Sequence, residues 1–283
     1  AGTWSLTGVN TYTGNTTING GVFSLEGTGK IYSAANIYGP IVTVNTGATL
    51  VIDRWAFDGS LGKLTYEKTG LVINGGTLKY SGSTNTMDYS NAARGFTVGS
   101  SGATFETVTS GVTWNLYRDT NVSYQAAFNG NLTLTGAGNG VIQQVISGTG
   151  NTLTKTGAGT WTLSGTNTYT GATTVNGGKL TFGIADSIAN SASVTLANTA
   201  GVIFDLGGYN QGIKNLSGGG ATGGNITVTG NVINTPGAAG GIYQTGTITT
   251  RSGSNISFTS NNNIDQGGAL TLVANTSGAD ANI

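Results

Sequence analysis

One stretch decides the fold: AGTWSLTGVNTYTGNTTINGGVFSL, residues 1–25. It recurs without a gap as AGTWTLSGTNTYTGATTVNGGKLTF at residues 158–182, and LVINGGTLKY at residues 71–80 echoes its second half. The recurring positions are Trp4 and Trp161, Asn10 and Asn167, Tyr12 and Tyr169, and the Asn-Gly-Gly triplets that begin at Asn19, Asn74 and Asn176. Internal repeats indicate an architecture in which each unit buries its apolar face against its neighbours.

Apolar residues alternate with Thr and Ser inside each unit, as in Trp161-Thr-Leu163. This period of two is typical of a half-buried strand. Runs of three to five such residues, separated by Gly, Asn and Ser, continue to the C-terminus, and no segment has a convincing helical period. We therefore predict an all-β fold, a β-solenoid with roughly 20–25 residues and three short strands in each coil.

An antiparallel sandwich or barrel is the alternative, because Asn-Gly between alternating runs is also a hairpin signal. A chain of 283 residues greatly exceeds the ~100 residues of a sandwich, whereas a solenoid uses this length naturally. We interpret residues 1–283 as a single continuous β-helix. Residues 1–25 and 158–182 are its homologous units, and residues 26–128 form a section elaborated with charged and aromatic loops.

The composition excludes several classes of function. The chain has 11 basic and 11 acidic residues without runs of one sign, so it lacks the electrostatic footprint of a nucleic-acid-binding protein. It has neither Cys nor His, which removes disulfides, thiolate nucleophiles, imidazole bases and imidazole metal ligands. We expect no cofactor and no metal. The absence of Cys also suits a secreted chain that crosses an oxidising compartment.

The best candidate for a ligand site is Asp53-Arg54-Trp55-Ala56-Phe57-Asp58, in the elaborated section that holds 14 of the 22 charged residues. A sugar ring could stack on Trp55 or Phe57 while Asp53, Arg54 and Asp58 hydrogen-bond its hydroxyls. The structural alternative is a loop in which the two rings cover a coil end and Arg54 pairs with a neighbouring aspartate. Trp4 and Trp161 occupy equivalent repeat positions, so we predict that both stack within their coils.

Two further possibilities depend on weaker signals. Asp53 and Asp58 beside Arg54 form the one cluster comparable to the acidic sites of β-helix enzymes that act on polysaccharides, but we assign no catalytic residue. Thr-x-Thr triplets such as residues 133–135 and 160–162 would suit an ice-binding surface. Their spacing along the sequence is irregular, and an outward Thr on each half-buried strand produces the same triplets.

The unit from Thr154 to Leu180 closely resembles the passenger-associated transport repeat of autotransporter proteins. Residues 94–99 and 204–213 resemble segments that accompany this repeat. The resemblance implies a right-handed parallel β-helix, exported through an outer-membrane barrel, in which the repeat aids transport and folding. It implies no catalytic residue. The stretch 253–272 is more similar to the coils of two-partner-secreted haemagglutinin-type adhesins.

These observations together predict a secreted or surface-exposed bacterial passenger β-helix that acts as an adhesin or structural stalk and not as an enzyme. The expected partners are a host glycan or matrix protein, a second copy of the chain, and the outer-membrane translocator during export, with no nucleic acid. A pore-forming or vacuolating toxin passenger and a polysaccharide-active enzyme remain the alternatives.

Overall fold

The computed structural model describes residues 2–12, 14–31, 41–55, 60–61, 70–86, 95–118, 125–188, 190–214 and 216–218, together with the backbone of five strands between residues 225 and 274. All regular secondary structure in these residues is β-strand. No helix in this part of the chain is long and apolar enough to cross a membrane. The chain forms two compact units, residues 1–148 and residues 149–283.

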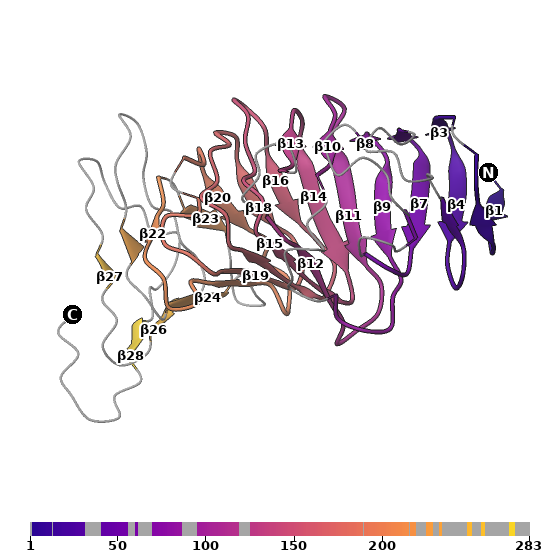
Figure 1. The fold of residues 1–283 in the computed structure, drawn as a ribbon. Helices are drawn as coiled ribbons and strands as arrows, with labels where there is room; N and C mark the ends of the chain where they lie inside the picture. Colours follow the sequence, from indigo (N-terminus) through magenta and orange to yellow (C-terminus); the bar gives the residue numbers. More distant parts are fainter. Residues whose placement is uncertain are drawn as a thin grey trace. The chain divides into compact units, whose positions relative to one another are not determined.

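The described residues of the first unit form fifteen strands, and Figure 1 labels most of them. They are β1 (Thr3–Ser5), β2 (Val9–Asn10), β3 (Thr16–Ile18), β4 (Gly21–Leu25), β5 (Lys30–Ile31), β6 (Val42–Asn45), β7 (Ala48–Ile52), β8 (Leu71–Asn74), β9 (Thr77–Tyr80), β10 (Thr97–Val98), β11 (Ala103–Thr107), β12 (Thr113–Leu116), β13 (Ala127–Phe128), β14 (Leu132–Gly136) and β15 (Asn139–Ile142). Within the unit, a long sheet has the order β1-β4-β7-β9-β11-β14 and a second sheet the order β3-β6-β8-β10-β13. All these neighbouring strands are parallel.

The other thirteen described strands belong to the second unit. They are β16 (Leu153–Lys155), β17 (Thr160–Leu163), β18 (Thr173–Val175), β19 (Lys179–Phe182), β20 (Val194–Leu196), β21 (Ile203–Asp205), β22 (Gln211–Gly212), β23 (Leu216–Gly218), β24 (Asn225–Val228), β25 (Val232–Ile233), β26 (Ile248–Thr250), β27 (Ile256–Ser257) and β28 (Leu272–Ala274). They pair in the orders β16-β18-β20-β23, β17-β19-β21-β24-β26-β28 and β22-β25-β27, again in parallel. Parallel strands that return to the same sheets at every coil confirm the predicted parallel β-helix and exclude the antiparallel sandwich.

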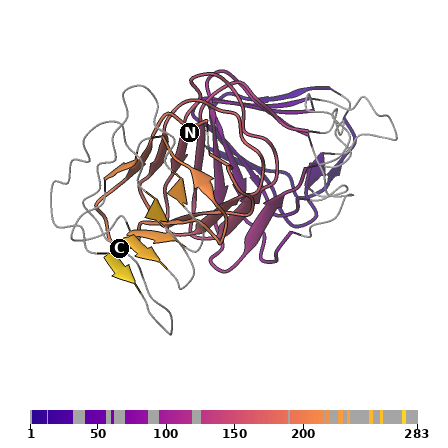
Figure 2. The same cartoon turned by 90° about the vertical axis from the view of Figure 1, so that its left-hand side faces the viewer.

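The two units differ in the length of chain in each coil. In the second unit, Leu163 faces Phe182 and Leu180 faces Phe204, which agrees with the predicted coil of roughly 20–25 residues. From β4 to β14 in the first unit the coils are longer than predicted, since Leu50 faces Leu78. Longer connections between strands account for the difference, because the paired segments themselves remain short. In the turned view, the successive strands of a sheet lie one behind another (Figure 2).

The core of the first unit is built from columns of inward side chains. Leu50, Leu78, Phe105 and Leu134 follow one another in register on the long sheet, and all four are buried. Beside this column lies an aromatic cluster whose ring centroids are 5.3–6.4 Å apart, made of Trp55, Tyr80, Phe96, Phe105, Trp114 and Phe128. Large rings in offset or edge-to-face contact contribute strongly to such narrow cores.

The Asn-Gly-Gly triplets lie at coil corners. Gly178 has a φ of +59°, and a Cβ there would lie 2.5 Å from the carbonyl oxygen of Gly157, so only glycine fits this position. At the corresponding corner of the first unit, the Asn45 amide donates to Asn19 Oδ1 over 2.7 Å, and Asn45 is in register with Asn74. Stacked asparagines therefore link successive corners.

A buried lysine closes one corner of the second unit. The side chain of Lys155 is fully buried, and its ammonium donates to the backbone carbonyls of Thr156 (2.5 Å), Gly157 (2.9 Å) and Gly177 (2.9 Å). Burial lowers the pKa of Lys155 from 10.5 to about 8, because the charged form loses its hydration. The fold thus holds a cation in a cradle of neutral carbonyl oxygens.

The two tryptophans of the repeat have different surroundings. Trp161 is 0% exposed and lies within its coil, while stacking of its ring stays a prediction; Trp4 is 76% exposed, so its ring does not pack inside a coil. Tyr169 is likewise buried and Tyr12 is 38% exposed, although each hydroxyl makes the same 2.6 Å hydrogen bond, to Thr173 and Thr16 respectively. Trp4 lies in β1, which pairs with β4 in the part of the chain that the structure describes.

The asparagines at equivalent repeat positions also use different partners. The Asn10 amide donates to the carbonyls of Gly8 and Lys30, whereas that of Asn167 is buried and donates to the Ser187 hydroxyl. Asn176 is exposed, and its backbone N–H donates to the carbonyl of Lys155. At these asparagine positions the two units of the repeat therefore differ in their side-chain contacts.

Candidate functional site

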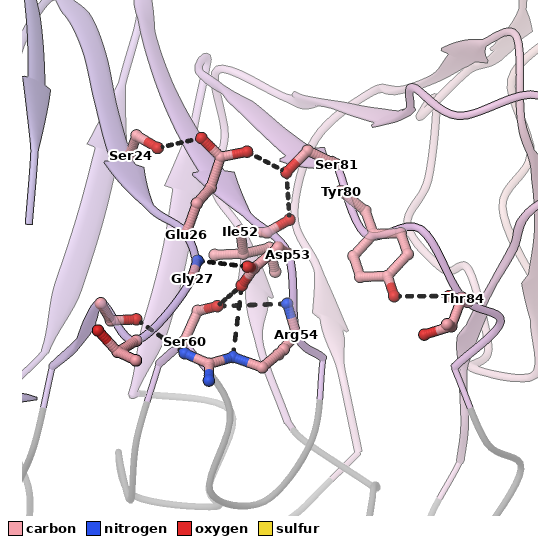
Figure 3. Close-up of polar contacts among 12 residues, drawn as sticks. Ser24, Glu26, Gly27, Ile52, Asp53, Arg54, Ser60, Tyr80, Ser81 and Thr84 are labelled. Carbon is pink, nitrogen blue, oxygen red and sulfur yellow. Dashed lines mark hydrogen bonds and ion pairs between the residues drawn. The ribbon is translucent and has the colours of Figure 1, made fainter. Parts of the chain in front are cut away.

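Asp53 and Arg54, two of the predicted ligand residues, lie at a corner where three strands of the long sheet end. Leu25, Ile52 and Tyr80 are in register on β4, β7 and β9. The residues that follow them, Glu26, Asp53 and Ser81, therefore come from three successive coils and meet at one corner (Figure 3).

Glu26 is held by two hydroxyls. Ser24 Oγ donates to one carboxylate oxygen over 2.6 Å, and Ser81 Oγ donates to the other over 2.5 Å. These two hydrogen bonds, that from Ser24 first, lower the pKa of Glu26 and outweigh the opposing effect of partial burial. Glu26 is therefore ionised at neutral pH, and such a carboxylate is unsuited to act as a general acid.

Asp53 and Arg54 form a second group of contacts below Glu26 (Figure 3). Asp53 Oδ2 accepts from the Gly27 N–H over 2.5 Å, and Oδ1 accepts from Ser60 Oγ over 2.8 Å. Arg54 Nε lies 3.4 Å from Asp53 Oδ1, and Arg54 Nη2 donates to the Gly29 carbonyl over 3.1 Å. Arg54 thus pairs with Asp53, as expected if the stretch is a structural loop in which Arg54 pairs with a neighbouring aspartate. Its side chain remains 41% exposed.

The side chain of Trp55 points away from the surface of this corner and into the core. It is 4% exposed and packs edge-on against Trp114 and Phe96, with centroid separations of 5.4 and 6.4 Å. A ligand at the surface would therefore meet Asp53 and Arg54 before the ring of Trp55. Phe57 and Asp58 lie outside the described residues, and ligand binding by the five residues stays a prediction.

Sequence reasoning missed Glu26 and Ser81, which complete the corner together with Ser60, a residue of the same stretch to which it gave no role. The available signal was positional, since Glu26, Asp53 and Ser81 each follow the last residue of an alternating run. Because both carboxylates already accept hydrogen bonds from neighbours, the arrangement is suited to fastening coils together, while Glu26 and part of the Arg54 side chain remain exposed. The described residues contain no group of three acidic, His or Cys side chains that could hold a metal.

Asp53→Ala is expected to lower the free energy of unfolding by about 1–2 kcal/mol, because the Gly27 N–H, the Ser60 hydroxyl and Arg54 all lose an acceptor. Urea unfolding followed by circular dichroism measures the loss. Asp53→Asn retains an acceptor oxygen and should lose less. Equal stability of Asp53→Ala and the parent chain would show that the corner does not fasten the coils.

Comparison with known proteins identifies the origin of these coils. The family described as passenger-associated-transport-repeat matches residues 1–25 and 153–182. The adhesin BmaC autotransporter of Brucella suis biovar 1 (strain 1330) is 35% identical over 212 residues, which cover 73% of this chain and 5% of that protein. The chain thus spans about 5% of the length of this relative. No solved structure matches the chain.

The family match coincides with both copies of the repeat, in which Trp4 and Trp161 are equivalent. The similarity to the autotransporter extends well beyond them, over most of the chain. The haemagglutinin-type resemblance of residues 253–272 stays a prediction, and most of that stretch lies outside the described residues. The chain is a passenger segment of an autotransporter protein, secreted to the bacterial cell surface and built on passenger-associated transport repeats.

Proposed function

We propose that this passenger segment serves adhesion, as a stiff β-helical element that binds surfaces and does not catalyse a reaction. The observation that carries the proposal is the 35% identity over 212 residues to an autotransporter that is itself named an adhesin. Parallel coils joined by continuous hydrogen-bonded ladders and buried side-chain columns support it, because they give the rigidity that a projecting element needs. The proposed partners are a host glycan or matrix protein, with the translocator acting during export.

Purified chain should bind host cells saturably and should compete with whole bacteria that display the protein. Fluorescently labelled chain, titrated onto epithelial cells and onto immobilised matrix proteins, measures this binding. Absence of saturable binding to every cell type and matrix protein would contradict the adhesive role.

Arg54→Ala tests the predicted ligand residues in the same assay. It removes the exposed cation of the corner without opening the core, unlike a change at the buried Trp55. Weaker cell binding in this variant would place a contact at the corner, and unchanged binding would place the contact elsewhere. Release of reducing sugar from polysaccharides by the parent chain, lost in Asp53→Ala and Arg54→Ala, would instead indicate an enzyme.

A further inference from the structure

The outer face of the long sheet carries a row of threonines, one from each of four successive coils. Thr49 of β7 faces Thr77 of β9, Thr77 faces Thr104 of β11, and Thr104 faces Thr133 of β14. All four side chains are half-buried, as outward residues of a sheet are. Parallel strands lie about 4.8 Å apart, so the row repeats a hydroxyl at that interval. We call these four residues the threonine row.

Alternation along each strand makes threonine common at outward positions, and the register of the long sheet brings four of them into one row. Its members come from four different coils and lie in strands of unlike sequence, ATLVI, TLKY, ATFET and LTLTG. The second sheet of the same unit provides the comparison, because its outward row is mixed. It reads Thr17, Thr43, Val72, Thr97, Ala127 in register. An outward position on these coils therefore tolerates apolar side chains, yet four successive strands of the long sheet have threonine, and the row ends at Val22 of β4.

The hydroxyls of the threonine row are available to a ligand. No side-chain hydrogen bond occupies any of the four in the part of the chain that the structure describes, whereas in the second unit Thr195 and Ser217 bond each other over 3.1 Å. In the adjacent outward row, Lys79 Nζ lies 3.0 Å from Glu106 Oε2, so the two charges on this face compensate each other. The face is thus rich in hydroxyls and electrically balanced.

We propose that the threonine row binds an extended, uncharged polysaccharide that lies across the strands. The inference rests on the proposed adhesive function and names the class of ligand and the surface. A hydroxyl both donates and accepts hydrogen bonds, as the hydroxyls of a sugar do, so a regular row can bond successive sugars of one chain. The balanced Lys79–Glu106 pair offers no net positive charge to an anionic glycan, which selects a neutral one.

Isothermal titration calorimetry with a panel of neutral, unbranched glucan and mannan oligosaccharides tests the proposal. At least one series should bind, with an affinity that rises with oligosaccharide length and does not change with added salt. The double variant Thr77→Val, Thr104→Val should weaken binding about tenfold or more, because two hydroxyls are lost while side-chain shape and strand preference are kept. Thr43→Val, the matched change on the second sheet, should leave the affinity unchanged.

Three results would overturn the inference: no binding of any neutral oligosaccharide, equal binding by the parent and the double variant, or equal weakening by Thr43→Val. Circular dichroism establishes whether each variant is folded. If the double variant does not fold, Thr133→Val repeats the test on a separate strand. Cell binding without neutral-oligosaccharide binding would overturn the inference and leave adhesion standing. If the parent chain bound neither cells nor oligosaccharides, the proposed adhesive function would be contradicted as well.

Discussion

Trp161→Ala is expected to lower the free energy of unfolding of the second unit by roughly 3–5 kcal/mol. The side chain is fully buried in β17, and its neighbour in register is Leu180, so truncation removes a large apolar area and leaves a cavity in a narrow core. Urea unfolding followed by circular dichroism measures the loss, which should appear as a lower midpoint or an earlier separate transition. Repeat proteins often unfold in steps, so the whole curve is fitted.

Trp4→Ala is the matched control, because Trp4 occupies the same position of the repeat but is 76% exposed. Its loss should cost under about 1 kcal/mol. Equal losses at the two positions would mean that the repeat position, and not the surrounding coil, determines the contribution of the ring.

Lys155→Met is expected to abolish a rise in stability at alkaline pH. The pKa of Lys155 is about 8 in the folded chain and 10.5 when exposed, so between these values the unfolded chain binds a proton that the folded chain has released. The free energy of unfolding of the parent should therefore rise by roughly 2–3 kcal/mol from pH 8 to pH 10.5. Below pH 8, Lys155 is charged in both the folded and the unfolded chain, so it adds no further change in stability with pH.

Unfolding midpoints of the parent and the methionine variant across this pH interval measure the effect. The difference between their slopes isolates Lys155, since every other titratable group is common to both chains. Parallel slopes would show that the ammonium is hydrated in solution, in spite of its three carbonyl contacts.

The features that the sequence could predict are those that repeat or alternate within a few residues. The strands at Trp161-Thr-Leu163 and around Leu180, and the coil length of the second unit, follow from local patterns. Lys155 follows the same alternation after Leu153, but its burial was not predicted, because a lysine there is typical of the end of a surface strand.

The features that escaped prediction depend on register between distant segments. Glu26 bonds Ser81, 55 residues further along the chain, and no local pattern joins them. The threonine row likewise becomes visible only when coils of unequal length are brought into register. The exposure of Trp4 depends on its neighbours in space, since its own sequence environment matches that of Trp161.

The register of these coils also bears on how the chain can fold. In both units a strand pairs with a strand that lies one coil away in the sequence, as Leu163 pairs with Phe182 and Val98 with Phe128. This separation does not increase when more coils are added to the chain. The search for a native partner is therefore always short, and the entropy of loop closure does not grow with each added coil. A chain delivered end first can add one coil at a time onto an edge already formed, so folding keeps pace with delivery and does not wait for the whole passenger.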